Sequence, residues 1–311
     1  MKRCYQDVLT INHLSLTIMK RFITLLLVVA ATLGAQAQLL WKVSGNGLDK
    51  PSYLFGTYHL ASLSIKDSIA ALPQVQQDVQ QVYGELVMAD MMKPETLMQM
   101  QQQMMLPADT TLKSLFSPEE FKVVSQAVTE YLKVDIALLD RMKPAAIFQQ
   151  LTVLFYLKHT PGYNPQEQLD ASFQQDATKA GKKVGGLETV QSQMDILFNK
   201  PLRRQAEDLY CFVSNPAKAE RQAKELIAAY AAQDLDKMLQ LMEEKEGTSC
   251  DPTPEEMAQL LYDRNHAWAK QMPALMQTAP TLFVVGAGHL PGEQGMLSLL
   301  KEKGYTVEPL K

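Results

Sequence analysis

Cysteine, basic charge and long apolar segments are all scarce in this chain of 311 residues. The chain has 3 cysteines and no Cys-x-x-Cys pair, which argues against a structural zinc site. Its formal net charge is −4 and its sequence contains no basic stripe, so we expect no binding to nucleic acid. Only one long apolar run is present, near the N-terminus, and no second run is a candidate membrane span.

Two common hydrolase motifs are also missing. The sequence contains no His-Glu-x-x-His, so it does not predict an ordinary zincin. It contains no nucleophile elbow of the Gly-x-Ser-x-Gly type, which disfavours a Ser-His-Asp hydrolase. Solenoid repeats and low-complexity linkers are absent as well. A hydrolase built from this chain would therefore need a different arrangement of chemical groups.

The apolar run near the N-terminus has the features of a secretory signal peptide. Met19 is followed by Lys20 and Arg21, residues 22–33 are apolar, and the small residues of 35–37 resemble a cleavage site. We therefore predict a signal peptide within residues 1–37, with an upstream extension before Met19, and a single domain over residues 38–311. The mature chain is expected to be periplasmic or secreted, with no stable membrane span after cleavage.

Two cysteines, Cys211 and Cys250, remain in the predicted mature chain. An oxidising compartment would allow them to form a disulfide. The sequence does not show that they meet, because the alternative is that they lie on separate helices. A disulfide between them is therefore one of two open interpretations.

One short sequence motif occurs near both ends of the predicted domain. Each copy is an apolar, β-prone run followed by a glycine, two further residues and a histidine: Gly56 with His59, and Gly286 with His289. A run that is apolar on both faces is typical of a strand covered on both sides. Ligands of open α/β sheets bind beyond the carboxyl ends of such strands. The hypothesis is that both histidines reach one site; the alternative is that they only cap turns.

The pattern predicts an α/β fold with many helices. Its central mixed sheet comes from two related strand–Gly-x-x-His–helix–strand halves, with helical insertions at about 91–180 and 200–278. Expected strands are residues 39–44, 52–56, 81–87, 183–188, 282–285 and 305–309, the first two forming a hairpin, and the helices of the two halves are expected at about 66–79 and 293–303. Helix starts are indicated at Ser117-Pro118-Glu119-Glu120, Asn164-Pro165-Gln166-Glu167 and Thr253-Pro254-Glu255-Glu256.

Polar residues interrupt otherwise apolar patterns at a few positions. Glu85 and Glu188 stand at the ends of predicted strands, where a buried carboxylate needs a partner. Arg264 falls on the apolar stripe of a predicted helix and has Asn265 beside it. A guanidinium facing the core needs an anion, so Arg264 either pairs with a structural carboxylate or points into a polar cavity.

Together these pieces resemble the TraB/GumN family, which is related to the animal Tiki metalloproteases. The resemblance rests on residues 40–43, 53–59, Glu85, 186–189, Arg264-Asn265, 285–292 and 304–307. It implies an active site made from His59, His289 and Glu85, and a divalent metal such as manganese, cobalt or zinc. Tyr58 departs from the family pattern, where a smaller aliphatic residue is expected.

Two functions compete on this evidence. The first is a secreted metal-dependent hydrolase acting on peptides or proteins, with His59, His289 and Glu85 as metal ligands. In it a glutamate, Glu85 or Glu188, acts as base, and Arg264 binds a substrate carboxylate or stabilises an oxyanion, next to Asn265. The second is a non-catalytic periplasmic protein that binds or sequesters a peptide or a metal in the same cleft.

Overall fold

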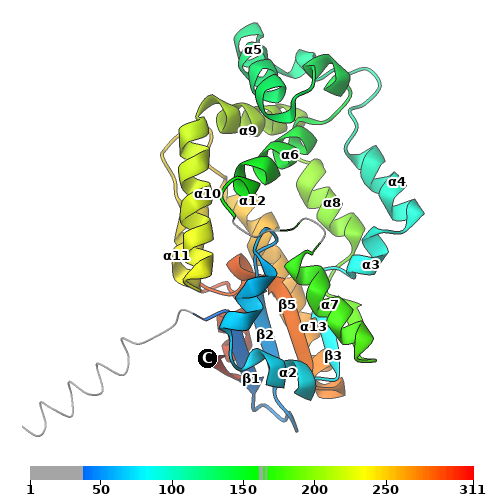
Figure 1. Cartoon of the computed structure of the whole chain (residues 1–311), viewed down its shortest axis with the longest axis vertical. Helices are drawn as coiled ribbons and strands as arrows, with labels where there is room; N and C mark the ends of the chain where they lie inside the picture. The colour runs from blue at the N-terminus through cyan, green and yellow to red at the C-terminus, as the bar shows by residue number, and fades with distance from the viewer. Residues whose placement is uncertain (1–37, 161–163, 165–166) are drawn as a thin grey trace, which may run out of the picture. The chain divides into compact units, whose positions relative to one another are not determined.

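The predicted sheet is present in the computed structural model, which describes residues 38–160, 164 and 167–311. Six strands pair in the order β4-β3-β5-β2-β1-β6 (Figure 1). They are β1 Leu40–Ser44, β2 Ser52–Thr57, β3 Gln81–Gly84, β4 Lys183–Gly186, β5 Thr281–Gly286 and β6 Thr306–Leu310. β4, β3, β5 and β2 run parallel, whereas β1 is antiparallel to both of its neighbours. The fold is therefore α/β with a mixed central sheet, as expected.

The two copies of the repeated motif form the centre of this sheet. β2 and β5 are parallel neighbours, with Phe55 opposite Val284 and Thr57 opposite Gly286. All six residues of β2 are buried, as are the first five of β5. A strand covered on both faces has to be apolar on both faces, which explains the unbroken apolar runs in the sequence. The prediction that both halves share one sheet is confirmed.

Each half is a strand, a histidine-bearing turn, a helix and a second strand. The first half is β2, η1 (Leu63–Ser68), α2 (Leu72–Asp78) and β3. The second half is β5, η6 (Ala287–His289), α14 (Met296–Glu302) and β6. Both helices are shorter than expected. In the first half a 3₁₀ turn precedes α2, and in the second Gly295 has an extended backbone, with ψ of 158°, and is the N-cap of α14.

The two edges of the sheet are made differently. β1 and β2 form the expected hairpin, whose loop has positive φ at Asn46 between two positive-φ glycines. β6 pairs only with β1 and carries Pro309, a residue that edge strands tolerate. The opposite edge is the short strand β4.

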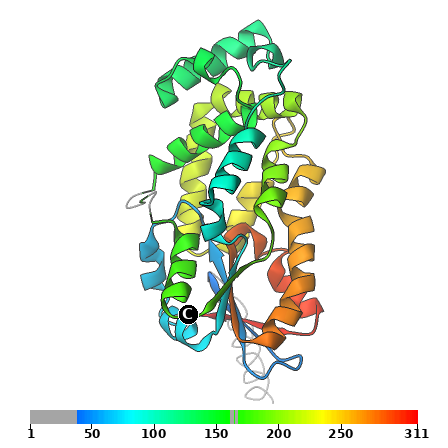
Figure 2. The same ribbon diagram turned by 90° about the vertical axis from the view of Figure 1, so that its right-hand side faces the viewer.

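Helices cover both faces of the sheet and extend beyond one end of it. Figure 2 shows α7 (Leu169–Lys179) with α2 on one face, and α13 (Asp263–Thr278) with α14 on the other. The remaining insertions are α3 Met88–Met91, α4 Pro94–Gln103, η2 Lys113–Leu115, α5 Pro118–Ala127, η3 Val128–Leu132, η4 Ile136–Leu139, α6 Pro144–Leu157, α8 Val190–Phe198, α9 Leu202–Ser214, α10 Pro216–Ala231, α11 Leu235–Glu243, α12 Pro254–Met257 and η5 Ala258–Tyr262.

The expected helix starts can be compared with their outcomes. Ser117 and Thr253 each cap a helix and form a capping box with the glutamate three residues later. The third predicted start includes Pro165 and Gln166, which lie outside the described residues, as do the predicted signal peptide and its upstream extension. None of the described helices combines the length and the apolarity that crossing a membrane requires.

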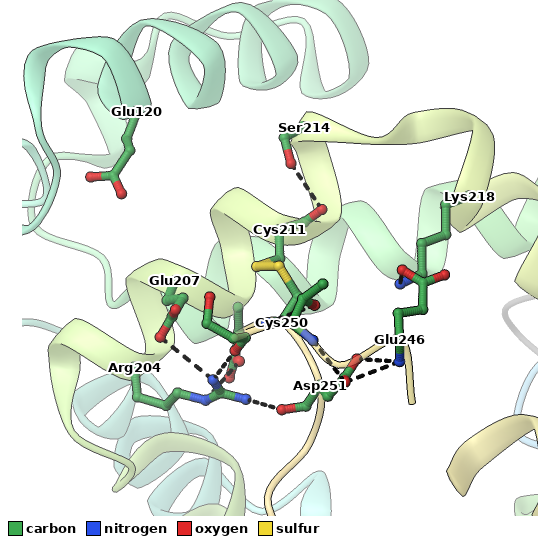
Figure 3. The surroundings of a disulfide bond; sticks show 12 residues. Glu120, Arg204, Glu207, Cys211, Ser214, Lys218, Glu246, Cys250 and Asp251 are labelled. Carbon is green, nitrogen blue, oxygen red and sulfur yellow. Dashed lines mark hydrogen bonds and ion pairs between the residues drawn. A yellow bond between two sulfur atoms is a disulfide. The ribbon is translucent and has the colours of Figure 1, made fainter. Parts of the chain in front are cut away.

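A disulfide joins α9 to the loop before α12. Cys211 on α9 is bonded to Cys250, in the loop before α12, with a Cα–Cα distance of 5.7 Å (Figure 3). Arg204, also on α9, donates to the backbone carbonyl oxygens of Ser249 and Asp251 on either side of this cysteine. The pairing that the sequence left open is therefore confirmed, and the loop is fixed to α9 by both contacts.

Candidate functional site

Four chemically reactive side chains follow the carboxyl ends of four parallel strands. His59 follows β2, Glu85 follows β3, Glu188 follows β4 and His289 follows β5. Parallel strands end at the same edge of a sheet, so this topology gathers the four side chains at one edge. β3 and β4 end at Gly84 and Gly186, earlier than predicted. The backbone turns after each glycine, and the N–H groups of Leu187 and Glu188 both donate to the carbonyl oxygen of Glu85.

Arg264 enters this edge from α13 and joins the two glutamates. Its Nε lies 3.1 Å from Oε2 of Glu188, and its second terminal nitrogen donates to both Glu188 and Glu85. The exposed fractions of the three side chains are 10% for Arg264, 9% for Glu85 and 10% for Glu188. The first alternative from the sequence, pairing with a carboxylate, is therefore what the geometry shows. Arg264 is the second residue of α13, which directly follows the π-helical turn η5.

Glu85 is held ionised in spite of its burial. Its Oε1 accepts the N–H of Gly286 at 2.7 Å, and its Oε2 accepts from Gln193 at 2.9 Å. Burial alone raises the pKa of Glu85, but His289, Arg264 and the Gly286 N–H outweigh it and lower the pKa to about 2. Because burial keeps His289 neutral at pH 7, the positive charges of Arg264 and His59, together with the Gly286 N–H, keep Glu85 ionised there.

His289 is buried and its tautomer follows from its neighbours. The Nδ2 group of Asn265 donates to the carbonyl oxygen of Gln294 at 2.8 Å, so Oδ1 faces the imidazole. Nδ1 of His289 lies 2.7 Å from that Oδ1 and therefore carries the proton. Its Nε2 keeps a lone pair, which faces Arg264 at 2.9 Å. Burial lowers the pKa of His289 to about 3, and the ring packs against Trp268 with centroids 4.5 Å apart.

His59 is held at the same ring nitrogen but in a different environment. Its Nδ1 donates to Oδ2 of Asp170 at 2.8 Å, while Thr57 donates to the other oxygen of that carboxylate at 2.7 Å. The side chain of His59 is 68% exposed. The charge of Asp170 raises the pKa of His59 to about 9. Nδ1 is therefore fixed in both histidines, and Nε2 is the nitrogen left for the site.

Sequence reasoning missed two residues of this arrangement. Asp170, near the start of α7, holds His59, and Gln193 of α8 donates to both Glu85 and Glu188. An Asp in the first turn of a helix and a Gln within a helix are ordinary residues, so neither gave a signal. Tyr58, the departure from the family pattern, packs beside Tyr156 and Tyr230, with ring centroids 6.0 and 5.5 Å away.

The donor types suit a divalent metal, although the donors are not assembled around one point. Imidazoles that bind metal through Nε2 commonly have Nδ1 held by an oxygen, which is the state of both His59 and His289. Within the described part of the chain, no three His, Cys, Asp or Glu side chains are grouped closely enough to hold an ion. The guanidinium of Arg264 occupies the lone pair of His289 and one oxygen of Glu85.

Comparison with known proteins identifies the family. The sequence profile of the TraB/PrgY/gumN family matches residues 39–309. The chain belongs to this family. It is 24% identical over 316 residues to the Metalloprotease TIKI2 of Danio rerio, an alignment that covers 86% of this chain and 60% of that protein. The Metalloprotease TIKI1 of Danio rerio is 24% identical over 319 residues, which cover 86% of this chain and 62% of that protein.

The alignments cover different shares of the chains. A Metalloprotease TIKI homolog of Amphimedon queenslandica is 37% identical, but only over 57 residues, or 17% of this chain and 11% of that protein. The chain spans about three fifths of the length of the two Danio rerio relatives. No solved structure matches the chain.

Proposed function

We propose that the chain is a divalent-metal-dependent hydrolase of peptide bonds. The main observation behind the proposal is that His59 and His289 are held in the same way, through Nδ1. Both rings are held at Nδ1 by an oxygen, and both follow strands that end at the edge of the sheet where the ionised Glu85 lies. The names of the Danio rerio relatives support the same class of activity.

The proposed metal ligands are His59, His289 and Glu85. A divalent ion held there, manganese, cobalt or zinc, would supply Lewis acidity and would activate water. Asn265 lies behind His289 and presents that ring in one tautomer, so we assign it a positioning role. Asp170 has the corresponding role for His59. Glu85 suits a ligand better than a base, because a carboxylate with a pKa near 2 takes up a proton weakly at neutral pH.

The remaining charged groups are proposed to act on the substrate. Glu188 is the second carboxylate of the site, and we propose that it accepts the proton of the attacking water. Arg264 carries a permanent charge and is proposed to bind the oxygen on which negative charge develops. Water then adds to the carbonyl carbon, the C–N bond breaks, and the leaving amine receives the proton.

The proposed location is periplasmic or secreted. The leader-like sequence of residues 1–37 supports export. The disulfide between Cys211 and Cys250 supports it independently, because such bonds persist in oxidising compartments.

The test combines metal analysis with a peptidase assay on purified protein. Manganese, cobalt and zinc are titrated calorimetrically into chelator-treated protein, and each form is incubated with a peptide library and analysed by mass spectrometry. We expect a bound ion and cleavage, with both lost in His289→Ala and Glu85→Gln. His266→Ala is the matched control, because this histidine is also on α13 but is exposed. Binding of a peptide or metal without cleavage would instead support the sequestering protein.

A further inference from the structure

A small apolar cavity lies within the helical insertions, outside the set of residues described above. Its volume is about 240 Å³. Apolar side chains from three segments line most of it: Ala145 and Phe148 of α6, Ile196 and Leu197 of α8, and Met257 with Leu260 of α12 and η5. None of the charged residues of the candidate site contributes to this lining.

The cavity is one helical turn away from the candidate site on two separate elements. On α8, Gln193 donates to Glu85 and Glu188, and Ile196 and Leu197 come three and four residues later. On the other side, Leu260 precedes Arg264 by four residues, and its carbonyl oxygen accepts from Arg264 at 2.9 Å. On the α-helix α8, residues three and four apart lie on the same face, about one turn along it, and the contact with the Leu260 carbonyl oxygen places Leu260 next to Arg264.

The size and lining of the cavity suit a single apolar side chain. Its volume is below the range of about 300–1,000 Å³ that pockets for drug-sized ligands occupy. The charged groups at its margin are already paired with one another: Lys200 binds Asp208 at 3.2 Å and Glu256 at 2.9 Å. A charged ligand group would have to compete with these pairs, whereas an apolar side chain would not.

The spacing also suits an extended peptide. A strand advances about 3.3 Å per residue, so a side chain one or two residues from the reacting carbonyl lies about one helical turn away. We propose that this cavity is the specificity subsite for a large apolar side chain, such as Leu, Met or Phe, close to the bond that is cleaved. This inference rests on the proposed function, since it assigns the side chain to a peptide bound at that site.

A larger cavity nearby is a poorer candidate. It measures about 460 Å³ and lies next to the disulfide, with Lys200, Arg204 and Glu256 in its lining. Arg204 binds both oxygens of Glu256 and two backbone carbonyl groups, so these charges are engaged in holding the loop of Cys250 to α9. Pro252, two residues from the disulfide, lines both cavities and gives the apolar one a fixed wall.

The test is a positional scan with labelled peptides. Nine fluorescein-labelled nonapeptides of Gly, Ala and Ser carry Leu at each position in turn, and a tenth carries none. We expect Leu at one position to raise kcat/KM at least about tenfold. Leu260→Trp, which fills the cavity, and Leu260→Glu, which places a charge on it, should each remove that preference and change cleavage of the Leu-free peptide less than about twofold.

Leu138→Trp and Leu138→Glu are the matched controls. Leu138 is on η4 and 77% exposed, and Leu260 is 37% exposed, so none of these substitutions disturbs the buried core. Thermal melts check that all four variants are folded. Equal cleavage of all ten peptides would overturn the proposal, and so would a Leu preference that survives both changes at Leu260.

A failure of the proposed function gives a different result. If no peptide is cleaved with any of the three metals, binding of the same ten peptides is measured by fluorescence anisotropy. A Leu preference in affinity that Leu260→Trp removes would support the subsite and overturn the hydrolase. Binding with no preference, or no binding at all, would overturn the subsite.

Discussion

The two histidines are equivalent in sequence and differ in their surroundings. His289 is buried, has an amide as its Nδ1 partner and is neutral at pH 7, whereas His59 is exposed, has a carboxylate partner and is protonated at both ring nitrogens. The same Gly-x-x-His turn therefore presents two different chemical states. The difference comes from the helices that contact each histidine, α13 for His289 and α7 for His59. Neither helix belongs to the repeated motif.

The comparison shows how the two halves of the site differ in the metal-free protein. The lone pair of His289 faces the buried charges of Glu85 and Arg264, and an amide that is itself bonded fixes the ring. His59 has to lose a proton before its Nε2 can bind a metal. The β5 half therefore holds its ring in one orientation with Nε2 bonded to Arg264, whereas the β2 half would have to change its protonation state if a metal bound.

The largest expected effect is at Arg264, in the buried half. Arg264→Ala should lower the free energy of unfolding by roughly 3–5 kcal/mol, because Glu85 and Glu188 would be left as buried carboxylates without a cation. Urea unfolding of chelator-treated protein measures this loss. His266→Ala, on the exposed face of the same helix, should stay within about 0.5 kcal/mol of the wild type.

The same variant separates a structural cation from a competitor for the metal. If Arg264 occupies lone pairs that an ion would use, Arg264→Ala should bind manganese or cobalt more tightly than the wild type in calorimetry, without cleaving peptides. A large loss of stability with no metal binding in either protein would leave an ion-pair cluster and remove the support for a metalloenzyme.

The orienting residues come next, and they should differ between the halves. Asn265 is buried and satisfies both the Nδ1–H of His289 and the carbonyl oxygen of Gln294, so Asn265→Ala should cost about 1–3 kcal/mol. Asp170→Asn keeps an acceptor for the buried Thr57 hydroxyl and removes only the charge beside an exposed imidazole, so it should cost less, about 0.2–1 kcal/mol. Equal costs in urea unfolding would contradict the contrast between a buried and an exposed half.

These partners also show where sequence reasoning reached its limit. The strands, the shared sheet and the two glutamates could be predicted, because a doubly covered strand and a polar residue at its end leave a local pattern. Arg264 was detectable because it interrupts an apolar stripe. Asp170 and Gln193 left no such pattern. They are polar residues on helices, where polar residues are common, and only the packing of α7 and α8 on the sheet gives them partners.

Exchanging the two partners tests whether they set the charge of each ring. Asp170→Asn removes the anion beside His59, so the pKa of that imidazole should fall from about 9 toward its ordinary value near 6.5. Asn265→Asp adds an anion beside His289 and should raise its pKa from about 3. NMR titration of the imidazole protons in metal-free protein follows both. Unchanged values in both variants would mean that burial alone distinguishes the rings.

The smallest expected effect is the pH dependence that the exposed half gives to stability. The folded pKa of His59 is raised to about 9, above its unfolded value near 6.5. Its bond to Asp170 therefore stabilises the fold fully below about pH 6.5, and this contribution is lost as the pH rises through 9. We expect the free energy of unfolding of the metal-free wild type to exceed that of Asp170→Asn by less than about 1 kcal/mol at pH 6, because His59 is exposed. The difference should be smaller at pH 9.5. Urea unfolding at the two pH values measures both margins, and a margin that grows with pH would show that His59 is not the proton-binding partner of Asp170.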